Sequence, residues 1–166
     1  MSDNREALER LYKRQTFGIK PGLDVIEALL LKLGNPDRSF GCIHVAGTNG
    51  KGSVCAMLDS VLRAAGGKIG LYTSPHLVSF NERICVDGTP VSNDELAVLI
   101  EKVEKAAGEV SVELKREPTF FECGTAMAFD YFRQRGVSLA VVEVGMGGRL
   151  DATNAITPLV SVITRV

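Results

Sequence analysis

The chain has 166 residues, roughly the length of one domain and enough to bury a sizeable core. Hydrophobic residues make up 45% of it and charged residues 23%, which excludes a disordered or collagen-like chain. The 19 Lys and Arg against 20 Asp and Glu leave a net charge of −1, so the composition does not favour a general binder of nucleic acids or membrane surfaces.

The sequence carries the marks of a cytoplasmic protein without nucleic-acid or membrane partners. Residues 1–6 lack the apolar core of a signal peptide, and the uncharged run 152–164 falls short of the about 20 apolar residues that span a bilayer. The four cysteines form no C-x-x-C pair, and three of them lie in apolar stretches, which indicates reduced, buried thiols. With only two histidines beside them, a zinc site is disfavoured.

Apolar periodicity predicts the elements in chain order. Two helices, over residues 4–13 and 23–33, precede a strand over 40–45, a helix over 53–65 and a strand over 68–72. Asp87-Gly88 then predicts the turn of a hairpin over 83–91, and Ser92 with Glu95 a capping box for a helix over 93–107. Residues 110–116 fit helix or strand. The last expected elements are a helix over 119–135 and strands over 139–144 and 159–164.

Strands that alternate with helices predict an α/β fold, a mostly parallel sheet with helices on both faces. The sequence stops directly after a strand of buried type, at Val166. A sheet that ended there would leave apolar surface open, so we expect a truncated domain, the front part of something longer.

A glycine-rich segment at residues 44–53 lies between a predicted strand and a predicted helix, where successive backbone N–H groups can bind an anion. Lys51 would add a charge on the phosphates, and the Ser53 hydroxyl is placed to reach a phosphate or Mg²⁺. The common phosphate-loop pattern is broken, because Val45 replaces its first glycine and Gly52 separates Lys51 from Ser53. The alternative is a glycine-rich turn with a solvated lysine; the flanking elements favour phosphate binding.

Glu143 ends a valine-rich strand, where open α/β sheets bind ligands, and a buried carboxylate there calls for a nearby cation. The alternative is an exposed glutamate or one paired with Arg149. Ser74 precedes Pro75, which favours an extended backbone that could direct its hydroxyl into the site; an ordinary loop serine is the alternative.

Other polar and aromatic candidates lie on loops and strands. His76 is expected either to contact a substrate or to lie in solvent, and His44 to be a core histidine. Residues 145–148 are not a dinucleotide fingerprint but a tight loop that brings Arg149 and Asp151 to a ligand. Phe120 and Phe121 are assigned to the core.

Five motifs together resemble a known family. GTNGKGS at 47–53 is similar to the phosphate loop of the Mur ligase superfamily. Within it, TSPHL at 73–77, FNER at 80–83, FFECGT at 120–125 and EVGMGGRLDATN at 143–154 resemble folylpolyglutamate synthase/dihydrofolate synthase, in that family's order. Muramoyl ligases usually carry Thr in place of Gly52 and lack the GRLDATN run. The resemblance implies a P-loop NTPase-like fold of the Mur ligase central-domain type.

The resemblance implies an ATP-dependent ligase. Mg²⁺-ATP would phosphorylate a carboxylate of dihydropteroate or a folate, and the amine of L-glutamate would attack the resulting acyl phosphate. Catalysis is expected to depend on Lys51 and Glu143.

Matching the motifs position by position extends these expectations to a residue set. The match assigns the ATP phosphates to Thr48, Asn49, Gly50 and Lys51, and the rest of the glycine-rich loop adds Gly47, Gly52 and Ser53. Mg²⁺ is assigned to Ser74 and Glu143, with Ser53 added from the loop pattern. The pterin substrate is assigned to Lys20, Pro21, Gly22, Thr119, Leu150, Asp151 and Ala152, with His76 added from its own position.

The family's enzymes are longer. Residues 1–166 are therefore expected to be the front of the ATP-binding domain, without the glutamate-binding C-terminal domain and inactive alone. An open sheet edge would let such a fragment self-associate, although the full-length protein is expected to be a monomer. Two alternatives remain open: another Mur-type amide ligase, or a non-catalytic nucleotide-binding module.

Overall fold

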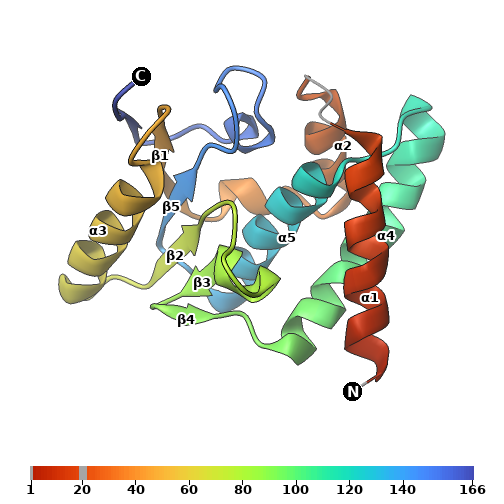
Figure 1. Cartoon of the computed structure of the whole chain (residues 1–166), viewed down its shortest axis with the longest axis horizontal. Helices are drawn as coiled ribbons and strands as arrows, with labels where there is room; N and C mark the ends of the chain where they lie inside the picture. The colour runs from red at the N-terminus through yellow and green to blue at the C-terminus, as the bar shows by residue number, and fades with distance from the viewer. Residues whose placement is uncertain (1, 19–21) are drawn as a thin grey trace.

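The computed structural model describes residues 2–18 and 22–166, which form a central sheet with helices on both faces (Figure 1). Helix α3 (Lys51–Ala64) covers one face of a six-stranded sheet, and α5 (Phe120–Arg135) covers the other. Outside α5 lie α1 (Ser2–Lys13), α2 (Asp24–Lys32) and α4 (Asn93–Leu114). The expected arrangement, with helices on both faces of the sheet, is confirmed.

The sheet has the order β4-β3-β2-β5-β1-β6. Its strands are β1 (Gly41–Ala46), β2 (Ile69–Tyr72), β3 (Ile84–Val86), β4 (Thr89–Pro90), β5 (Leu139–Glu143) and β6 (Val160–Ile163). The last four strands of that order are parallel, whereas β3 and β4 form an antiparallel hairpin. Val45 of β1 pairs with Glu143 of β5, so the carboxyl ends of these two central strands lie side by side.

Local signals mark most element ends. Asp87 and Gly88 both have positive φ, at 51° and 76°, as the turn of a two-residue hairpin requires. Ser92 and Thr119 begin α4 and α5 with the reciprocal hydrogen bonds of a capping box. Residues 110–114, which the sequence left open, continue α4, because Val110 extends its buried stripe.

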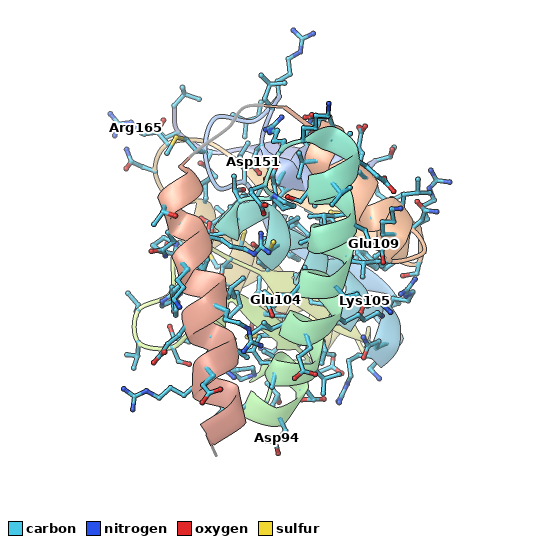
Figure 2. All side chains as sticks on the ribbon, turned by 90° about the vertical axis from the view of Figure 1, so that its right-hand side faces the viewer. Asp94, Glu104, Lys105, Glu109, Asp151 and Arg165 are labelled. Atoms are coloured by element: carbon cyan, nitrogen blue, oxygen red, sulfur yellow. The ribbon has the colours of Figure 1, made fainter. Side chains whose placement is uncertain are left out.

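The outer helices pack closely. Figure 2 shows α1 and α4 side by side, and Arg10 Nε lies 3.0 Å from a carboxylate oxygen of Glu104 across that contact. Within residues 2–18 and 22–166, no helix combines the length and the hydropathy needed to cross a bilayer.

The main core lies between the sheet and the four helices on the α5 side, and its largest fully buried side chains include Tyr72, Phe129 and Phe132. A smaller cluster under α3 centres on Val45, Cys55 and Val141. All four cysteines are buried and unpaired, as their scattered positions indicated. This smaller cluster holds both ends of the phosphate loop in place, since Val45 of β1 and Cys55 of α3 both belong to it.

Candidate functional site

The loop between β1 and α3 has the backbone expected of a phosphate loop. Gly47 has φ 134°, and a Cβ there would lie 2.0 Å from Thr164 Oγ1, so only glycine fits. Gly50, at φ 82°, directs the chain into α3, and its carbonyl accepts the Val54 N–H at 3.0 Å. The N–H groups of the first helical turn have no carbonyl one turn earlier, which leaves them to an anion.

Two backbone N–H groups of the loop already donate hydrogen bonds within the protein, whereas the sequence predicted that successive N–H groups would bind an anion. The N–H groups of Thr48 and Asn49 donate to the carbonyl oxygen of Arg165, at 2.9 and 3.2 Å. Lys51 is half-buried at the start of α3, and Ser53 is exposed beside it. The groups that face outward for a phosphate are therefore those around Gly50, Lys51 and Ser53.

Glu143 lies directly behind this loop. Glu143 is 5% exposed and lies at the carboxyl end of β5. Its Oε2 accepts a hydrogen bond from the Ser74 backbone N–H at 2.9 Å. A Cβ on Gly52 would be 3.7 Å from Glu143 Oε1, an ordinary van der Waals distance, which places the start of α3 next to the carboxylate. Burial raises the pKa of Glu143, while the Ser74 hydrogen bond, Lys51 and Arg83 oppose the rise.

The expected alternatives for Glu143 do not occur. The carboxylate is buried rather than exposed at a sheet edge, and within the described residues it forms no ion pair with Arg149. A buried carboxylate whose pKa is raised by burial is stabilised by a bound cation.

The oxygen donors here suit Mg²⁺. Within residues 2–18 and 22–166, no three His, Cys, Asp or Glu side chains gather into a metal-binding group, so the carboxylate that the site offers is Glu143, with the Ser74 backbone beside it. Mg²⁺ commonly binds through one or two carboxylates, with water and phosphate oxygens completing its shell. Glu143 and Ser74 fit that pattern.

A cavity of about 770 Å³ opens beside Ser74, within the size range of small-molecule sites. Its walls come from the loop after β5, the start of α5, the segment after β2 and the loop that precedes α2. They include the predicted pterin residues Gly22, Thr119, Leu150, Asp151 and Ala152. Two further predicted residues, Lys20 and Pro21, lie outside the described part of the chain.

The predicted polar residues also hold these walls in shape. Asp151, labelled in the upper part of Figure 2, accepts the Met146 N–H at 2.9 Å and the Thr153 N–H at 3.0 Å. Thr119 caps α5, and its hydroxyl and N–H each donate to Glu122 Oε2 at 2.7 Å. The loop after β5 and the start of α5 are therefore fixed by their own hydrogen bonds.

The two histidines lie off the cavity wall. His44 is buried in β1 as expected, with Nε2 2.8 Å from Thr153 Oγ1. His76 lies behind Arg83, with one ring nitrogen 2.7 Å from Arg83 Nε and the other 3.3 Å from the Tyr12 hydroxyl. Substrate contact by His76 thus stays a prediction, since the structure brings Arg83 rather than His76 to the cavity.

Sequence reasoning missed several cavity residues. Phe120 and Phe121, assigned to the core, also line the cavity, and a Cβ on Gly145 would lie 2.5 Å from the Phe121 ring. Arg83, in the FNER segment, reaches the cavity while 8% exposed. The one feature of the sequence that could have pointed to Arg83 is its position, a positive charge directly before the apolar strand β3.

Comparisons with known proteins find relatives that match nearly the whole chain. No protein-family model matches the chain. A curated Bacillus subtilis protein named dihydrofolate synthase/folylpolyglutamate synthase is 40% identical over 163 residues, which is 98% of this chain and 38% of that protein. This chain thus spans about two fifths of its relative's length.

Two similar solved structures are ligand complexes. Mycobacterium tuberculosis folylpolyglutamate synthase complexed with ADP matches with a TM-score of 0.91 and 41% identity, over 98% of this chain and 36% of that one. A folylpolyglutamate synthase complex with AMPPCP and folate matches with a TM-score of 0.87 and 41% identity, over 96% of this chain and 39% of that one.

Proposed function

The chain belongs to the folylpolyglutamate synthase/dihydrofolate synthase family, and from this premise we propose that it binds ATP, Mg²⁺ and the pterin substrate of a glutamate ligase. The ligase would add L-glutamate to dihydropteroate or to folate polyglutamates. In this proposal the 166 residues are the front of the ATP-binding domain, and L-glutamate binds elsewhere in the protein.

One observation carries the proposal. Ser74 both donates its N–H to Glu143, behind the phosphate loop, and lines the 770 Å³ cavity. A nucleotide phosphate at the loop and an acid in the cavity would therefore meet at Ser74. This is the arrangement that phosphoryl transfer to a carboxylate needs, because the reaction depends on positioning and on charge stabilisation.

The proposed reaction has two steps. A carboxylate oxygen of the pterin substrate attacks the γ-phosphorus of ATP, the bond to the bridging oxygen breaks, and ADP leaves. The amine nitrogen of L-glutamate then attacks the carbonyl carbon, inorganic phosphate leaves, and the nitrogen loses a proton to give the amide.

The chain's own residues orient the first step. The Lys51 ammonium and the N–H groups of the first turn of α3 hold phosphate oxygens. Glu143 and Ser74 would hold Mg²⁺, which would neutralise phosphate charge when bound. Thr119 and Asp151 face the pterin substrate from two walls of the cavity, and Ala152 adds an apolar surface.

Calorimetric titrations of the chain, one with Mg²⁺-ADP and one with 7,8-dihydropteroate, test nucleotide binding at the loop and pterin binding in the cavity. We expect both to bind. Gly148 lines the cavity, and a Cβ there meets no described atom within 4 Å, so Gly148→Leu should weaken dihydropteroate binding at least tenfold and spare ADP. Gly108→Leu, which is equally open on α4, is the control and should change neither.

The result that would overturn the proposal is ADP binding without dihydropteroate binding, above all if a muramoyl peptide precursor binds instead. That outcome would leave nucleotide binding intact and remove the pterin assignment.

A further inference from the structure

We propose that Arg83 is the anion anchor of the cavity, where its guanidinium binds the carboxylate of the pterin substrate. The inference rests on the proposed function and adds to it the residue that recognises the acid to be phosphorylated. His76 and Tyr12 act as positioning residues behind Arg83. Three features of the described residues carry the inference, namely the lack of an acidic partner for Arg83, its fixed orientation and its place on the cavity wall near Glu143.

The Arg83 charge has no carboxylate partner of its own. The residue is 8% exposed, yet within the described part of the chain no Asp or Glu lies within ion-pair distance of it. Burial raises the pKa of the nearby Tyr72 hydroxyl to about 12, so that group is neutral and cannot balance the guanidinium. An almost buried cation without a counter-ion is costly, and an anionic ligand would remove that cost.

The orientation of Arg83 is held on several sides. Arg83 Nε donates to His76 Nδ1 at 2.7 Å, so the His76 proton lies on Nε2, which donates to the Tyr12 hydroxyl. Burial and Arg83 itself lower the pKa of His76, which keeps the ring neutral and able to accept. The guanidinium carbon also lies 5.6 Å and 5.3 Å from the ring centres of Phe80 and Phe120.

This bracing leaves the ends of the guanidinium for a ligand. Nε is used by His76, and Arg83 also has a side-chain hydrogen bond with the Tyr72 hydroxyl. The N–H groups that remain on the terminal nitrogens can donate to a carboxylate. The Arg83 carbonyl accepts the Thr73 N–H at 3.0 Å, which ties this residue to the segment that contains Ser74. A fork fixed before the ligand arrives loses little entropy on binding.

The location of Arg83 suits the proposed reaction. Arg83 lines the same cavity as Ser74, and its charge helps to lower the pKa of Glu143 against the effect of burial. A substrate carboxylate held by Arg83 would therefore lie next to the proposed Mg²⁺ ligands and face the phosphate loop. The remainder of the substrate would occupy the cavity.

The test compares two ligands that differ in one charge, 7,8-dihydropteroate and its carboxamide. Calorimetry on the wild-type chain should show a preference for the acid of at least tenfold. Arg83→Met keeps an apolar stem against Phe80 and Phe120, and should abolish the preference while binding the amide as the wild type does. Arg83→Lys, which restores a charge but not the fork, should recover part of the preference.

Arg135→Met is the matched control, because the Arg135 guanidinium also lies over an aromatic ring, that of Tyr131 at 5.7 Å, but outside the cavity. It should leave the preference unchanged. The inference is overturned if the wild type binds acid and amide equally, a result that needs no variant and leaves the proposed function standing. It is also overturned if Arg83→Met weakens both ligands alike. If neither ligand binds to the wild type, the proposed function fails as well.

Discussion

The Glu143 carboxylate and the Ser74 backbone N–H are hydrogen-bonded at 2.9 Å across the carboxyl ends of two neighbouring parallel strands. Through this bond, β5 holds the segment that follows β2. Glu143 also lies against Gly52 of the phosphate loop, and Ser74 lines the cavity. One contact between residues 69 positions apart therefore joins the two halves of the candidate site.

Lys51→Ala should lower the affinity for Mg²⁺-ADP by about tenfold or more, where each tenfold corresponds to about 1.4 kcal/mol. Lys51 is half-buried and forms no ion pair among the described residues, so the melting temperature should change little. Calorimetry and thermal unfolding measure the two effects. Lys105→Ala, on α4 in Figure 2, is the control on an exposed lysine. Equal ADP affinity in Lys51→Ala and wild type would contradict the assigned role.

Gly47→Ala should destabilise the chain by about 2–4 kcal/mol, because it combines overpacking with an unfavourable backbone. The new Cβ would meet Thr164 Oγ1 at 2.0 Å, at φ 134°. Gly50→Ala isolates the backbone effect, since at φ 82° its Cβ meets no described atom within 4 Å, and should cost about 1–2 kcal/mol. Urea unfolding gives both values; equal losses would show that the Thr164 contact is unimportant.

Glu143→Gln should stabilise the chain at neutral pH without Mg²⁺. Burial raises the pKa of Glu143 above its ordinary 4.5, so protonation favours the folded state and stability falls as pH rises through the folded-state pKa. Glutamine removes the charge and keeps an acceptor for the Ser74 N–H. Denaturant unfolding should therefore favour the variant at pH 7.5 and show the two proteins converging in acid. A variant less stable than wild type at pH 7.5 would refute this.

The free energy of unfolding should fall as pH is lowered from about 7.5 to 5.5. Burial lowers the pKa of His44 below 6.5, although Asp151 opposes part of the shift, so the unfolded chain takes up this proton more readily than the folded one. Stability is thus lost as pH falls through the unfolded-state pKa.

His44→Gln retains a donor for Thr153 and should flatten that pH dependence. The pKa of His76 is also lowered by burial, and His76→Gln reports its separate share. An unchanged slope in His44→Gln, measured by urea unfolding at a series of pH values, would show that His44 does not titrate in this window.

The sequence by itself determined the local features of the fold, those that depend only on residues close together in the chain. The capping boxes at Ser92 and Thr119, the turn at Asp87-Gly88 and the glycine-rich loop at residues 47–53 all appear where the pattern predicts them. Each depends on backbone preferences and hydrogen bonds over a few residues. The extension of α4 through residues 110–114 is different, because the sequence left it open and the packing of Val110 on the core decided it.

Only the tertiary structure decided which distant residues meet. The sheet order places β5 between β2 and β1, which brings Glu143 to Ser74 on one side and to the phosphate loop on the other. It also puts Arg83 on the cavity wall with His76 behind it. The N–H groups of Thr48 and Asn49 donate to the carbonyl oxygen of Arg165, which is more than 100 residues away in the chain. Periodicity specifies which face of a strand is buried but not which strand lies beside it. That choice depends on packing across the whole sheet, between residues far apart in the chain.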